Sequence, residues 1–164
     1  MVGVCRLCDR ETVLEESHVV PSFVYKWLKE SSWTGALRCG LQPNKRVQDG
    51  YKFFWLCGTC EDRLNTWETT FAALVFYPFN KEETDTVSYG AWLLKFCTSI
   101  SWRVLNLFIE EDNFYQKAPE PVQDAARRAY TVWKEFLLDK RPHPGRHEQH
   151  LLPLDTIQSY TTQN

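Results

Sequence analysis

A strong excess of charge is missing from this 164-residue chain, because 19 Lys and Arg stand against 21 Asp and Glu. The formal net charge of -2 and the pI near 6.1 exclude a basic, histone-like or ribosomal-like nucleic-acid binder, since no overall positive field would attract phosphate. Any contact with nucleic acid would therefore need a local basic patch.

A leader and a membrane-spanning segment are also missing. The sequence runs from Met1 directly into a cysteine pair, without a basic and then apolar stretch. The most apolar region, Ala91 to Ile109, contains Lys95 and Arg103, which a spanning helix of roughly 20 apolar residues would not tolerate. We therefore expect a cytoplasmic protein with no membrane partner and a buried helix in this region.

Methionine is nearly absent, with one residue, whereas seven Trp, seven Tyr and ten Phe are present. Large rigid rings rather than adaptable fillers therefore build the core. No internal repeat is visible, and the polar run from Asn80 to Asp85 is the most obvious boundary. We predict a compact, irregular unit at residues 1–80, a helical region at 86–141 and a loop-like tail at 142–164.

Local patterns predict the elements of an α+β protein. Asp49-Gly50 between two strand-like runs is a strong hairpin signal, predicted to join residues 45–48 to 51–56. The spacing of apolar residues predicts one further strand, at 13–20, and four helices, at 21–28, 59–76, 87–108 and from 121 onward.

Four of the six cysteines form two Cys-x-x-Cys pairs, Cys5 with Cys8 and Cys57 with Cys60. Four thiolates are the ligand set of a tetrahedral structural zinc site. Disulfides are disfavoured in a reducing compartment, and a thioredoxin-type motif would need one pair in a βαβ setting. We therefore predict that these four cysteines bind structural Zn²⁺.

A second signal lies between the two cysteine pairs. Glu15-Glu16-Ser17-His18-Val19-Val20-Pro21 follows the first pair, and Leu56-Cys57-Gly58-Thr59-Cys60 opens a helix. Over residues 5–68 this arrangement resembles the zinc-stapled branch of the HNH nucleases, and it is similar to small bacterial and phage zinc-knuckle proteins that contain Ser-His-Ile-Ile-Pro. The resemblance implies a zinc-bound ββα or treble-clef-like unit, here packed against a mainly helical second half.

The resemblance also implies a mechanism. The strand histidine, His18 here, is the general base that activates water against a phosphodiester, and one Mg²⁺ or Mn²⁺ stabilises the charge that develops. The family has a metal-binding Asp or His directly before the base, where this sequence has Ser17, a weak ligand for a hard dication. Glu16 could replace it, because it shares a strand face with His18. The other candidate ligands are Asn44, Glu61 and Asn65.

Each candidate also has a structural role open to it. His18 could bond a backbone carbonyl or bind zinc in place of a thiolate. Asn44 suits a turn, and Glu61 lies in a first helical turn, where the helix dipole favours a carboxylate. Three cations on the predicted hairpin could contact phosphates: Lys45, Arg46 and Lys52.

Three of the four histidines fall in the tail, at His143, His147 and His150. Pro142 and Pro144 argue against a helix at the start of this cluster, so we expect a loop without chemistry. A run of leucines, residues 151, 152 and 154, follows and would pack this loop back on the domain.

Two functions follow from these patterns. The leading hypothesis is a metal-dependent HNH-like nuclease, or a module derived from one, that acts on nucleic acid with His18 as base. The alternative is a non-catalytic zinc-knuckle protein that binds a protein partner, for instance in conflict between phages and bacteria. Ser17 and the slight acidity favour the alternative, whereas His18-Val19-Val20-Pro21 between two cysteine pairs favours the nuclease.

Overall fold

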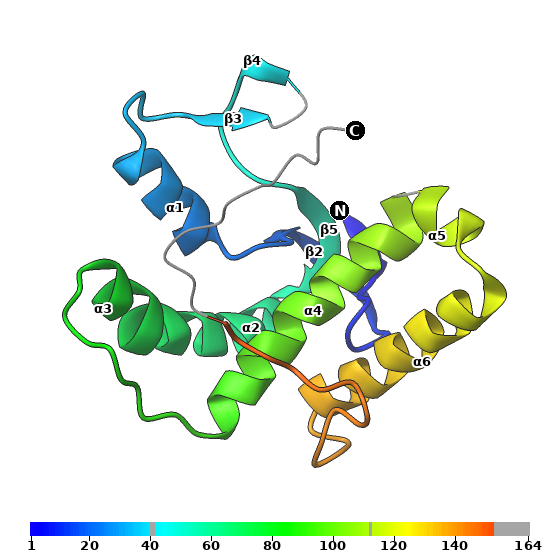
Figure 1. Ribbon diagram of the computed structural model, residues 1–164. Coiled ribbons are helices and arrows are strands. Elements are labelled where there is room, and N and C mark those ends of the chain that lie inside the picture. The colour runs from blue at the N-terminus through cyan, green and yellow to red at the C-terminus, as the bar shows by residue number, and fades with distance from the viewer. Residues whose placement is uncertain (40–41, 112, 153–164) are drawn as a thin grey trace, which may run out of the picture.

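The computed structural model describes residues 1–39, 42–111 and 113–152. Its class is α+β, as predicted, with a small antiparallel sheet and a mainly helical second half (Figure 1). The elements in chain order are β1 (Val2–Val4), β2 (Glu11–His18), α1 (Ser22–Ser31), β3 (Leu37–Cys39), β4 (Gln42–Val47), β5 (Lys52–Cys57), α2 (Gly58–Phe71), the π-helical η1 (Ala72–Phe76), α3 (Tyr77–Asn80), α4 (Ala91–Glu111), α5 (Asn113–Lys117) and α6 (Glu120–Leu137).

The central sheet has the strand order β1-β2-β5, and β2 is antiparallel to both neighbours. The register of β2 against β5 shifts between Glu15 and Glu16, which marks a β-bulge. Because of this extra residue, Leu14 and Ser17 are both buried although their spacing is odd. Glu16 and His18 then lie on the other side of the strand, beside Lys52 and Asp49.

The predicted hairpin at Asp49-Gly50 is wrong. β4 pairs with β3 in a separate two-stranded sheet, whereas β5 pairs with β2 in the central sheet. The turn at Asp49-Gly50 therefore carries the chain from one sheet to the other. The reason is that Trp55 and Leu56 of β5 are buried in the core beneath β2. Gly50 is still needed, because a Cβ there would lie 1.9 Å from the Tyr25 ring.

The predicted helices are present with shifted ends. α1 begins at Ser22 directly after Pro21, as expected. The helix predicted at 59–76 continues through the π-helical turn and α3 to Asn80. α4 begins at Ala91 rather than Val87, and residues 142–152 of the tail contain no helix or strand.

The core consists of two clusters that α4 connects. One surrounds the cysteines and includes Leu64, Trp102 and Leu137; the other stacks Phe71 on Phe96, with ring centroids 3.9 Å apart. Figure 1 shows α4 crossing the molecule between α2 and α6. Within the described part of the chain, no helix is both long and apolar enough to cross a membrane.

Arg103, one of the charges that spoke against a membrane span, is 1% exposed at the centre of this packing. Its guanidinium donates to the His18 carbonyl oxygen at 2.9 Å and pairs with the Glu68 carboxylate. It thereby joins α4 to the end of β2 and to α2.

We predict that Arg103→Met lowers the free energy of unfolding by about 3–5 kcal/mol, because it leaves the Glu68 carboxylate buried without its partner. Arg127→Met is the matched control, since Arg127 pairs with Asp124 on the surface and should cost less than about 1 kcal/mol. Urea unfolding of both variants measures the difference, and equal losses would contradict the role given to Arg103.

Candidate functional site

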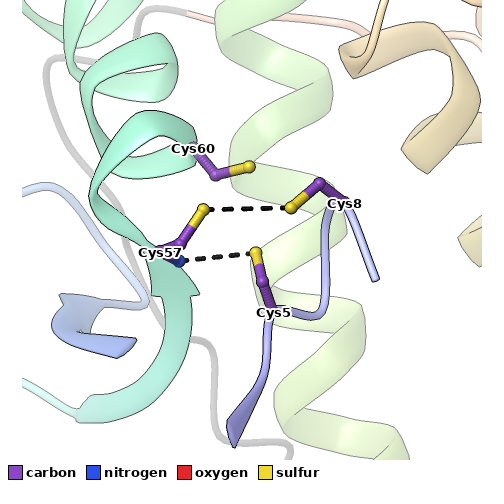
Figure 2. Close-up of side chains that lie close together, drawn as sticks. All are labelled: Cys5, Cys8, Cys57 and Cys60. Carbon is purple, nitrogen blue, oxygen red and sulfur yellow. Dashed lines mark hydrogen bonds between the residues drawn. The ribbon is translucent and has the colours of Figure 1, made fainter. Parts of the chain in front are cut away.

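The four cysteines of the two pairs meet at one point (Figure 2). Cys5 and Cys8 lie in the turn between β1 and β2, Cys57 ends β5, and Cys60 lies in the first turn of α2. Their sulfur atoms all lie within 4.8 Å of one another, and those of Cys8 and Cys57 are 3.8 Å apart. A tetrahedral zinc ion with bonds of about 2.3 Å separates its sulfur ligands by about 3.8 Å, so the group can hold such an ion.

Backbone geometry shapes the first pair for this role. The Asp9 N–H donates to the Cys5 carbonyl at 2.8 Å, and Asp9 itself has a φ of 62°, a left-handed conformation that Asp tolerates better than most residues. The Cys57 N–H donates to the Cys5 sulfur at 3.4 Å. Such N–H donors stabilise a thiolate ligand and fix its orientation.

The thiols differ in their electrostatic environment. Burial raises the pKa values of Cys5 and Cys60. Burial also acts on Cys8, but the Arg10 guanidinium, 3.3 Å from its sulfur, outweighs it and lowers the pKa of Cys8 to about 6. A bound metal ion would remove the protons from the thiols and offset the cost of burying four thiolates, so this donor set suits a cation.

Helices from the second half brace this centre. Arg6 lies over the Trp55 ring at 4.7 Å and pairs with Glu110 of α4. Lys134 of α6 pairs with Asp9 at 2.6 Å. The first cysteine pair is therefore held from outside by both long helices.

His18 ends β2, and all four thiols come together without it. Its Nε2 lies 3.1 Å from Asp49 Oδ1, and its ring centroid lies 5.9 Å from that of Tyr25. The backbone is fixed on both sides, because Arg103 binds the His18 carbonyl and the Val19 N–H donates to the Tyr51 carbonyl at 3.0 Å. The imidazole as a whole is 19% exposed, whereas its Nε2 is buried and makes no hydrogen bond among the described residues.

Asp49 is the carboxylate that faces His18, and it is ionised at neutral pH. Burial raises its pKa, but hydrogen bonds from Lys52 and the Gly50 N–H, together with His18, outweigh burial and lower the pKa well below its usual range. Lys52 Nζ lies 2.8 Å from Asp49 and 3.6 Å from Glu16. Three alternating charges, Glu16, Lys52 and Asp49, therefore lead along this face to His18.

Ser17 points to the other side of β2, where it is fully buried. Its hydroxyl donates to the Glu61 carboxylate at 2.7 Å. Burial raises the pKa of Glu61, although Ser17 and Arg103 lower it in part. The residue before His18 and the residue after Cys60 are thus neighbours in space.

The other predicted ligands do not join this pair. Asn44 lies in β4 and not in a turn, and Asn65 is exposed on α2. Glu16 and Glu61 are held by different partners, Lys52 and Ser17. Among the described residues, the cysteines are the one group of three or more His, Cys, Asp or Glu ligands that could hold an ion.

The tail histidines form no common site within residues 142–152. The His147 ring packs edge-on against Trp133, with centroids 5.7 Å apart, and His150 faces Glu148 at the surface. His143 accepts a hydrogen bond from the Gly145 N–H. Leu151 and Leu152 line a surface pocket beside α4, while Leu154 lies outside the described residues.

Sequence reasoning missed Asp49 and Arg103 as partners of His18. Asp49 carries a local signal for a turn, and that signal hides its role as a carboxylate. Arg103 lies 85 positions from His18 in an apolar helix. The available sequence signal was the cation itself, because an arginine within an apolar helix indicates a buried acidic partner.

Comparisons with known proteins add no assignment. No family model, curated protein or solved structure matched the chain. The chemistry of the site therefore has to be argued from its own geometry.

We predict that the purified chain contains one zinc ion and that Cys57→Ser loses both the metal and cooperative unfolding. Cys97→Ser is the control, because Cys97 packs against the aromatic cluster and lies outside the cysteine group. Metal content by mass spectrometry and thermal unfolding measure both effects. Full metal content in Cys57→Ser would contradict the assignment of the ligands.

Proposed function

We propose that this protein is an HNH-like nuclease, or a module derived from one, in which His18 is the general base and the four cysteines hold a structural zinc ion. The observation that carries the proposal is the 3.1 Å approach of His18 Nε2 to the ionised Asp49. Because Nε2 is buried and faces the Asp49 carboxylate, Nδ1 is the nitrogen that can take a proton from water. The carboxylate then stabilises the imidazolium that forms.

The reaction follows from these groups. Water loses a proton to His18 and attacks phosphorus, while the bond from phosphorus to the leaving oxygen breaks and its electron pair stays on that oxygen. The leaving oxygen takes a proton from solvent, and the His18 imidazolium returns its proton to solvent. Lys52, which is 28% exposed, supplies a positive charge near the negative phosphate. Arg103 fixes the backbone of His18 but does not reach the substrate, because it is buried.

The contact between Ser17 and Glu61 supports the resemblance to the HNH family. These are the two motif positions, before the base and after the second cysteine pair, where that family has catalytic metal ligands. Their present chemistry, one hydroxyl and one carboxylate, is a poor ligand set for Mg²⁺ or Mn²⁺. We therefore assign no step to such an ion, and the dependence on Mg²⁺ or Mn²⁺ stays a prediction from the resemblance.

An alternative function, binding of a protein partner, has its own support. Val2, Val4 and Val13 are more than half exposed on β1 and β2, and β1 is an edge strand of the sheet. Under this alternative, His18→Ala would leave the binding of the protein partner unchanged.

We expect cleavage of labelled DNA or RNA to fall about 10²–10⁴-fold in His18→Ala, which removes the base, and at least about tenfold in Asp49→Asn. His147→Ala is the matched control, because His147 lies in the tail against Trp133. Rates are measured with Mg²⁺, with Mn²⁺ and without either ion, on protein of verified zinc content. Unchanged cleavage by His18→Ala rejects His18 as base, and no cleavage by the parent chain under any condition favours the alternative function.

A further inference from the structure

A pocket of about 500 Å³ opens between α1, the β3–β4 hairpin and the turn at residues 49–51. Two tyrosines, Tyr25 and Tyr51, and three aliphatic side chains, Leu28, Leu37 and Val47, line its walls. This volume lies within the range of about 300–1,000 Å³ that is typical of small-ligand sites. The mixture of rings and aliphatic groups suits a flat, partly apolar ligand.

The pocket is next to the proposed base. Asp49 and Tyr25 belong to its lining, and both also lie against the His18 ring. Gly50 leaves room for the Tyr25 ring, since a Cβ at that position would collide with it. A ligand in the pocket would therefore bind beside the residues that surround His18.

The segment that forms the pocket is rich in basic residues although the chain is slightly acidic. Between residues 22 and 52 the acidic residues are only Glu30 and Asp49. The basic residues in the same range are Lys26, Lys29, Arg38, Lys45, Arg46 and Lys52. A local excess of basic residues of this kind is what contact with nucleic acid requires in a protein of net negative charge, and Arg38 and Lys45 of this set line the pocket.

Two features of the β3–β4 hairpin indicate an anionic ligand. Arg38 and Arg46 are cross-strand partners, and like charges directly opposite each other destabilise a strand pair. Lys45 lines the pocket and has no ion-pair partner among the described residues. A phosphate bound at the hairpin would meet the positive charges of Lys45 and Arg46.

We propose that this pocket receives one unstacked base of a single-stranded nucleic acid, and that the hairpin cations bind the flanking phosphates. This inference rests on the proposed nuclease function and names its substrate class. Tyr51, 69% exposed, lines the pocket and provides a ring on which any base can stack. A base within a duplex is stacked and paired, so it cannot enter the pocket without leaving the helix.

The experiment measures binding separately from cleavage, using the zinc-loaded, full-length His18→Ala chain without added Mg²⁺. The probes are a fluorescein-labelled 12-nucleotide single strand, as DNA and as RNA, and the DNA duplex of the same sequence. When Tyr51→Ala is added to the His18→Ala chain, fluorescence anisotropy should show about 5- to 100-fold weaker binding of the single strand than in the His18→Ala chain alone. This is the loss expected for one base–aromatic stack. Tyr51→Phe should bind as the parent does, because the ring is kept.

Tyr89→Ala is the matched control, since Tyr89 is 72% exposed and lines the surface pocket beside α4 instead. Tyr89→Ala should leave binding unchanged. Arg46→Ala should weaken binding and should reduce the slope of log K against log salt concentration by about 1, as expected for the loss of one phosphate contact. Tighter binding of the duplex, or unchanged binding by Tyr51→Ala, overturns the proposal. The DNA and RNA strands decide which sugar the site accepts.

The two proposals can fail separately. If single strands bind through Tyr51 but the parent chain cleaves nothing, the pocket stands and the nuclease is rejected. If the parent chain cleaves duplex DNA and Tyr51→Ala cleaves it equally well, the nuclease stands and the pocket is rejected.

Discussion

Closure of the chain at the four cysteines is the constraint on which the rest of the structure depends. Cys8 and Cys57 are 49 positions apart, and the closed segment contains β2, α1, β3, β4 and β5. The entropy cost of closing a loop rises slowly with its length, so a long insertion between the cysteine pairs is tolerated. A metal bound by four thiolates provides a free energy of the size needed to hold that closure.

The same closure sets the position of the proposed base. Leu14 lies opposite Cys57 in the β2–β5 pairing, and His18 lies opposite Lys52 further along the same ladder. The bulge after Glu15 turns Ser17 inward and leaves His18 beside Asp49. The β-bulge thus places the buried contact between Ser17 and α2 on one side of β2 and the charged side chains beside His18 on the other.

The parts that the sequence predicted correctly are those determined by local chemistry. The cysteine spacing predicted the thiol group, and Pro21 followed by Ser22 predicted the start of α1. The hairpin at Asp49-Gly50 was wrong because a turn signal does not specify which strand β5 will pair with, and burial of its apolar side chains selects β2. The same limit hid the Arg103 contact, which depends on how α4 packs across the sheet.

The central claim is that His18 is a base whose Nε2 faces Asp49 and whose Nδ1 accepts the proton. The most direct measurement is a long-range ¹⁵N–¹H NMR spectrum of the imidazole rings in the zinc-loaded protein, with His18→Ala used to assign the signal. The account predicts that neutral His18 is protonated at Nε2, toward Asp49, and that Asp49→Asn shifts its ring signals. Protonation at Nδ1, or a spectrum unchanged by Asp49→Asn, would contradict it.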